Sequence, residues 1–196
     1  MGSPESAITL DALREQASSC TRCALAAGRT QVVFGVGNPE ADLLFVGEGP
    51  GREEDRIGEP FVGRSGQLLD RLMREELGLD RSQCYIANVV KCRPPGNRDP
   101  EPQEIESCRP YLEGQVELIG PRVVVTLGNF AARTLLGTTE GIRTLRGHVY
   151  PFRGGQLVPT YHPAFALRSG GEILAEMRAD FVRAKRLLAA PSGPGS

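Results

Sequence analysis

Four short apolar runs alternate with amphipathic stretches along this chain, and this alternation limits most strongly how the chain can fold. The runs are rich in β-branched residues and end at Gly, Lys or Pro, as buried strands do. They occupy residues 41–49, 84–90, 122–128 and 155–163. Because strands that alternate with helices build parallel sheets, we predict an α/β fold with a mainly parallel sheet covered by helices on both faces.

Helices are predicted over residues 66–78, 101–120, 128–137 and 172–190. The first has one apolar face, and Gly78 stands where a helix stop is expected. The second contains Pro110. Since proline removes a backbone donor inside a helix, we expect this helix to be kinked or restarted there.

The 196 residues are 40% hydrophobic and 24% charged, enough for one compact domain over residues 1–196. The segments "MGSPES" and "APSGPGS" predict short flexible tails. No apolar run has the length of a membrane span, and no basic segment precedes an apolar one at the start, so a soluble intracellular protein is expected. The net charge of −1 indicates no overall basic field for nucleic acid.

Five cysteines in such a chain favour thiols or metal ligands over disulfides. Cys20 and Cys23 form a C-x-x-C, and Cys92 and Cys108 flank the Pro-rich loop "RPPGNRDPEPQEIES". A metal would fix a loop that has no regular backbone pairing. Four thiolates suit zinc or an iron–sulfur cluster, and spacing alone leaves the two open. Cys84 lies inside a strand run and is predicted to be a buried apolar residue.

The residues just after each strand are the candidates for ligand binding, because parallel sheets bind ligands beyond the carboxyl ends of their strands. The first such loop, "GEGPGREED", has no G-K-[ST] and carries an acidic cluster, which disfavours phosphate and favours a neutral flat ligand beside Glu48. The last, "HPAFALR", is expected to be a loop that begins at His162 and carries Phe165, Leu167 and Arg168.

The segments "GEGPGREEDRIGEPFVGRSGQLL", "YIANVVKCRPPGNR" and "HPAFALR", together with the four cysteines, resemble the family 4 uracil-DNA glycosylases of bacteria and archaea. The resemblance extends from about Cys20 to Arg168. It implies three α/β/α layers around a central four-stranded, mainly parallel sheet, and excision of uracil from DNA in base excision repair. It also implies a [4Fe-4S] cluster on Cys20, Cys23, Cys92 and Cys108. Gly49 stands where the family more often has Ala, another small residue.

The resemblance also implies roles for single residues. Glu48 and His162 are the expected catalytic residues, with Glu48 orienting water or stabilising a sugar cation and His162 donating to uracil O2. The expected uracil-binding residues are Gly49, Glu54, Phe61, Asn88 and His162, and the expected DNA-binding residues are Phe165, Leu167 and Arg168. Glu54 would exclude the methyl group of thymine.

Only Lys91 and Lys185 are lysines, so we expect a monofunctional glycosylase without lyase activity. We further expect a cytoplasmic, nucleoid-associated monomer that acts on single- or double-stranded uracil-containing DNA and does not bind membranes. Two other classes remain as alternatives: a DNA-binding module without catalysis, and a zinc-bound nucleotide hydrolase.

Overall fold

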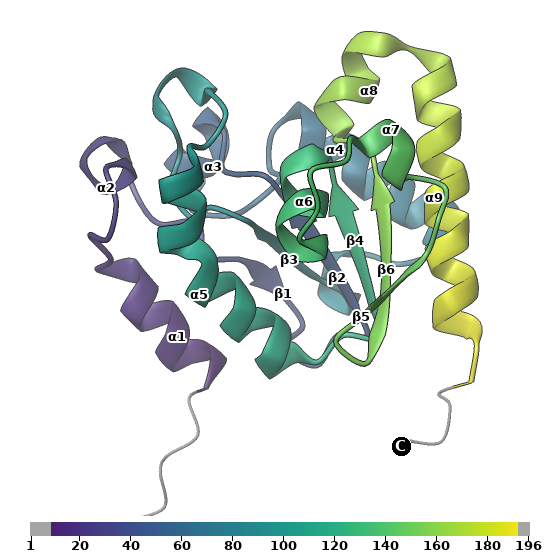
Figure 1. Cartoon of the computed structure of the whole chain (residues 1–196), viewed down its shortest axis with the longest axis horizontal. Coiled ribbons are helices and arrows are strands. Elements are labelled where there is room, and N and C mark those ends of the chain that lie inside the picture. Colours follow the sequence, from purple (N-terminus) through teal and green to yellow (C-terminus); the bar gives the residue numbers. More distant parts are fainter. Residues whose placement is uncertain (1–8, 192–196) are drawn as a thin grey trace, which may run out of the picture.

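A computed structural model describes residues 9–191, and its centre is one six-stranded sheet with the order β1-β3-β2-β4-β6-β5 (Figure 1). The four central strands are parallel, whereas β1 and β5 pair antiparallel at the two edges. The predicted central sheet is confirmed, and the two short edge strands were not predicted. The strands are β1 Val36–Gly37, β2 Leu43–Gly47, β3 Tyr85–Asn88, β4 Val123–Leu127, β5 Tyr150–Phe152 and β6 Gly155–Thr160.

Helices connect the strands and cover both faces of the sheet (Figure 1). The α-helices are α1 Leu10–Ser18, α2 Leu25–Gly28, α3 Arg52–Ile57, α4 Arg64–Leu72, α5 Pro102–Ile119, α6 Asn129–Leu136, α7 Ile142–Leu145, α8 Pro163–Ser169 and α9 Gly171–Ala189. A π-helical turn, η1 Met73–Leu77, extends α4, and two 3-10 turns are η2 Arg81–Gln83 and η3 Pro95–Asn97. Within residues 9–191, every helix is too short or too polar to cross a membrane.

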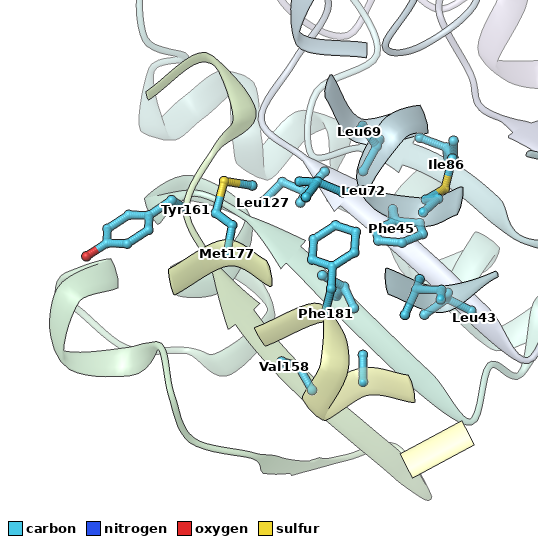
Figure 2. Close-up of a cluster of buried hydrophobic side chains, with 14 of the residues drawn as sticks. Leu43, Phe45, Leu69, Leu72, Ile86, Leu127, Val158, Tyr161, Met177 and Phe181 are labelled. Atoms are coloured by element: carbon cyan, nitrogen blue, oxygen red, sulfur yellow. The ribbon is translucent and has the colours of Figure 1, made fainter. Parts of the chain in front are cut away.

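Alternate residues of β2 point to opposite faces and so build two separate cores. Leu43 and Phe45 pack beneath α4 and α9, where the Phe45 and Phe181 rings stack with centroids 5.6 Å apart (Figure 2). Leu44 and Val46 pack beneath α1 and α5 on the other face. Every residue of β2 is buried, which explains its unbroken apolar sequence. The three predicted layers are confirmed.

Two local expectations need correction. Helix α5 is not restarted at Pro110 but continues through it to Ile119, so of the two outcomes expected there only a kink stays a prediction. Pro110 is exposed, so water can satisfy the Glu106 carbonyl that loses its helical donor. The segment after His162 is the helix α8 rather than a loop, because Pro163 occupies the first helical turn, where proline needs no donor. The predicted flexible tails fall largely on residues 1–8 and 192–196, outside the described residues.

The connections between strands leave a crevice beyond their carboxyl ends. From β2 the chain passes to β3 on one side, whereas from β4 it passes to β6 on the other. Loops that diverge in this way open the sheet edge to a ligand. Glu48, Asn88 and His162 all lie at this edge, each at or just after the end of a parallel strand.

We predict that Asp180→Ala lowers the free energy of unfolding by about 3–5 kcal/mol, because it removes the buried carboxylate partner of Arg146 and leaves this arginine with the more exposed Glu176 alone. Asp180 is fully buried on α9. Its carboxylate accepts from Arg146 at 3.0 and 3.1 Å and from the Thr160 hydroxyl at 2.8 Å, which joins α9 to the end of β6. Urea-induced unfolding measures the loss. As the control, Glu113→Ala removes an exposed pair with Arg153 and should cost less than about 1 kcal/mol.

Candidate active site and cysteine cluster

One pocket beyond the strand ends collects most of the predicted site residues. This strand-end pocket is lined by seven of them, Glu48, Gly49, Glu54, Phe61, Asn88, His162 and Arg168. Pro94, Asn97, Arg98 and Asp99 also line it, and all four come from the Pro-rich loop between Cys92 and Cys108. No site role was predicted for these four residues. Segments far apart in the chain therefore build a single site.

Asn88 is the last residue of β3 and lies in register with Gly47 on β2. Its side chain is 1% exposed, and among the described residues its Oδ1 atom has no hydrogen-bond partner. A buried amide oxygen without a partner is costly, and at a pocket wall it marks a place where a ligand donor belongs. A Cβ atom at Gly47 would lie 2.5 Å from this oxygen, so only glycine fits there.

Phe61 has a backbone φ of 55°, in the left-handed region that bulky residues rarely adopt. Its side chain is 5% exposed, and its ring centroid lies 5.7 Å from that of His162. A Cβ atom at Gly47 would also come within 2.5 Å of the Phe61 ring. Outliers of this kind persist where the surroundings hold them and are common at ligand sites.

The Glu54 carboxylate binds backbone N–H groups rather than side chains. It accepts from Gly51 at 3.1 Å, from Val62 at 3.0 Å and from Gly63 at 2.9 Å. These bonds join the glycine-rich turn after β2 to the segment that follows Phe61. Glu54 therefore stands as a fixed part of the pocket wall, and its predicted exclusion of thymine stays a prediction.

His162 caps the start of α8, where its Nδ1 atom accepts from the Ala164 N–H at 3.1 Å. A ring nitrogen that accepts carries no proton, so the neutral imidazole bears its proton on Nε2. Burial, together with the positive charge of Arg168, lowers the pKa of His162 to about 4. At neutral pH this side chain is therefore an uncharged donor at the pocket wall.

Glu48 follows β2 directly and is partly buried. Burial and the nearby Asp99 carboxylate raise its pKa to about 7. Asp99 belongs to the Pro-rich loop, so that loop influences the charge of a predicted catalytic residue. A carboxyl group with a pKa near 7 is a common property of catalytic sites.

The three predicted DNA-binding residues lie differently on α8. Arg168 is exposed and lines the strand-end pocket. Leu167 is 46% exposed and lines a neighbouring groove with Arg64 and Arg71. Phe165 turns the other way, and its ring lies 5.4 Å from that of Tyr161 beside the core. The helix thus brings only the first two to the surface around the pocket.

The four predicted metal ligands surround one hollow, which we call the cysteine hollow; it is lined by Cys20, Cys23, Cys92 and Cys108. The Lys91 backbone N–H lies 3.2 Å from the Cys108 Sγ, and the Arg29 guanidinium lies 3.4 Å from the Cys92 Sγ. Such donors stabilise thiolates that bind metal. Cys84 lies elsewhere, in the core beside Met73, as predicted.

The four cysteines at the cysteine hollow are a sufficient set of ligands for zinc or for an iron–sulfur cluster. Among residues 9–191, no three His, Cys, Asp or Glu side chains lie close enough together to hold a single metal ion. A zinc ion needs its sulfur ligands about 2.3 Å away on all sides, whereas an iron–sulfur cluster binds each cysteine at a different iron.

Comparisons with known proteins agree with this geometry. A model of the uracil DNA glycosylase superfamily matches residues 34–187. The chain is 42% identical over 193 residues to the type-4 uracil-DNA glycosylase of Sulfurisphaera tokodaii, covering 93% of this chain and 86% of that one. The same kind of protein from Thermotoga maritima is 43% identical over 182 residues, covering 91% and 94%. That of Archaeoglobus fulgidus is 45% identical over 167 residues, covering 81% and 83%. The resemblance is confirmed: the chain belongs to the type-4 uracil-DNA glycosylases of the uracil-DNA glycosylase superfamily.

Proposed function

We propose that this protein is a monofunctional uracil-DNA glycosylase that flips uracil out of DNA and hydrolyses its N-glycosidic bond in base excision repair. The observation that carries the proposal is the buried, unpartnered Oδ1 of Asn88 in a pocket that also holds a neutral histidine donor. We further propose one domain, built on the single sheet, and a cytoplasmic monomer that acts at the nucleoid on single- or double-stranded DNA.

Base recognition follows from the donors and acceptors of the pocket. Uracil presents a donor at N3 and an acceptor at O4, and a carboxamide at position 88 matches both, with its oxygen accepting and its nitrogen donating. The Phe61 ring stacks on the flipped base, a contact worth about 1–3 kcal/mol. Glu54, fixed by three backbone N–H groups, occupies the space near uracil C5.

Bond cleavage builds negative charge on the departing base and positive charge on the sugar. The Nε2–H of His162 donates to uracil O2 most strongly in the transition state, and the Gly49 N–H assists it. A neutral imidazole suits this role, because it stabilises the developing anion without first giving up a proton. The Glu48 carboxylate orients the water or stabilises the sugar cation, and either role requires its ionised form.

A lyase step needs an amine nucleophile in the pocket. The positions of both lysines argue against one there and so support simple hydrolysis. Lys91 is 1% exposed, and its Nζ donates to the Asn88 carbonyl at 2.7 Å and to the Gln115 side chain. It lines the cysteine hollow instead of the strand-end pocket. Lys185 lies on the exposed side of α9.

We propose that Cys20, Cys23, Cys92 and Cys108 hold a [4Fe-4S] cluster with a structural role. When bound, the cluster joins the segment after α1 to both ends of the Pro-rich loop. A bidentate pair of Arg98 with Glu104, at 2.9 and 2.6 Å, holds the same loop from within. Asp99 is thereby kept near Glu48.

Around the pocket we propose that Arg168 and Leu167 contact DNA, with Leu167 entering the base stack that the flipped nucleotide leaves. Phe165 supports them by anchoring α8 against Tyr161.

The test of the function is a uracil-excision assay at several pH values. We expect free uracil to be released, and the rate to rise with pH through about 7, because Glu48 must lose its proton. Below that pH the rate should fall about tenfold per unit. Glu48→Gln should abolish this dependence and lower the rate about 100-fold or more, whereas Glu40→Gln, on an exposed turn, should change neither.

Other outcomes of this assay identify the alternatives. Salt-dependent DNA binding without any uracil release would indicate a non-catalytic binding module. Phosphate release from nucleotides by a zinc-containing preparation would indicate a hydrolase.

Asn88→Asp tests base recognition. Cytosine has an acceptor at N3 and a donor amino group, so a protonated aspartic acid matches it as Asn matches uracil. We expect uracil excision to fall about 10- to 100-fold, since polar groups are left unpaired. Slow cytosine excision should appear and rise as pH falls, because burial raises the carboxyl pKa. Asn38→Asp, in a turn outside the pocket, is the control. A folded Asn88→Asp protein with no cytosine release at any pH would contradict the assignment.

Iron content tests the cluster. Protein purified without oxygen should be brown and contain about four iron atoms per chain. Cys108→Ser should lower the iron content, and Cys84→Ser, in the core, should leave it unchanged. Iron analysis and absorption spectra measure both variants. Loss of iron from the Cys84 variant, or a colourless active protein with zinc, would show that the ligand set is wrong.

A further inference from the structure

The strained backbone at Phe61 is held by one arginine that lies outside the strand-end pocket. Arg81, at the start of η2, donates from Nη1 to the Pro60 carbonyl at 2.9 Å and from Nη2 to the Phe61 carbonyl. Its Nε donates to Asp70 Oδ1 on α4 at 2.7 Å. The planar guanidinium thus joins two consecutive carbonyls to a carboxylate, which a lysine ammonium could not reproduce.

Other contacts restrict the backbone conformation of residues 60–63 further. The N–H groups of Val62 and Gly63 donate to Glu54, so the carbonyls and the amides of this segment are bound by different side chains. A Cβ atom at Gly66 would lie 1.7 Å from the Phe61 carbonyl oxygen, which shows how closely α4 approaches this peptide. A left-handed phenylalanine persists only under such restraint.

Arg81 itself lies outside the strand-end pocket. It lines a separate hollow with Asp70, Met73 and Arg74. Arg81 therefore does not contact a base bound in the strand-end pocket directly, and its bond to the Phe61 carbonyl links it to a residue that lines this pocket.

We propose that Arg81, oriented by Asp70, is a positioning residue that holds Phe61 in its left-handed conformation and so sets the ring for stacking on the flipped base. This inference rests on the proposed function for the identity of the base. The hydrogen bonds from Arg81 to the Pro60 and Phe61 carbonyls, however, exist in the free protein and do not depend on that function.

The first test uses the free protein and needs no substrate. Arg81→Ala should speed hydrogen exchange of the Val62 and Gly63 amides about tenfold, since bonds between carbonyls and a charged group contribute at least that factor. Arg178→Ala is the matched control, because Arg178 also binds two acceptors, and within residues 9–191 its side-chain hydrogen bonds go to Glu75 and Glu76 on η1 instead of residues 60–63. Unchanged exchange in the Arg81 variant, or equal acceleration in both, would overturn the proposal.

The second test measures inhibition by free uracil in the Phe61 and Phe61→Ala backgrounds. With Phe61 present, Arg81→Ala and Arg81→Lys should each weaken inhibition about tenfold, the share expected of a lost stacking contact. With Ala at position 61 the same changes should have less than about a twofold effect, because coupled residues are not additive. Affinity for DNA with an abasic site should stay unchanged. Equal losses in both backgrounds would indicate a general structural role and overturn the proposal.

The two tests separate this inference from the proposed function. Wild-type protein that releases no uracil would refute the function, and the exchange comparison would still decide whether Arg81 holds Phe61. Normal uracil release with additive Arg81 and Phe61 effects would refute only the positioning role.

Discussion

Burial of the four parallel strands on both faces is the constraint on which the rest of the molecule depends. All residues of β2 and β3 are buried, so a polar side chain along either strand is costly unless it finds a partner. The predicted catalytic and base-binding side chains of Glu48, Asn88 and His162 lie at the strand ends, where they line one pocket. The helices that supply the covering layers also bring Glu54 and Arg168 to the same edge. One requirement of the sheet therefore determines both the core and the location of the site.

Burial also decides the charges inside the pocket. It raises the pKa of Glu48 and lowers that of His162, and both shifts favour the uncharged form. The histidine stays neutral throughout the physiological range, while the glutamic acid titrates within it. A pocket with these properties receives a neutral base without a large desolvation cost. The pocket still contains one ionisable group, Glu48, whose pKa is raised by Asp99 on the Pro-rich loop.

The sequence was informative wherever one local pattern carried the signal. Apolar runs located the four central strands, and family motifs named seven of the residues that line the strand-end pocket. The edge strands β1 and β5 were missed because two or three residues carry no periodicity. Helix α8 was not predicted, because proline is typical of loops, although it also occurs in the first turn of helices, as Pro163 does here.

The parts that could not be predicted depend on contacts between distant segments. Arg81 reaches back twenty positions to the Phe61 carbonyl, and nothing in its own neighbourhood indicates that partner. The left-handed φ of Phe61 likewise has no signature in the sequence, since phenylalanine disfavours it. Asp99 was not recognised because its nearness to Glu48 depends on how the Pro-rich loop folds.

The Asn88 and Phe61 side chains approach Gly47 so closely that they limit which substitutions the site can accept during evolution. Any side chain at this position would meet both the Asn88 oxygen and the Phe61 ring, each at 2.5 Å. A substitution there would damage two functional residues at once, and neither could restore the pocket by moving alone. Stepwise adaptation to another base therefore has an open path through position 88 and a closed one through position 47. Gly47 thus leaves the space that both of these side chains occupy.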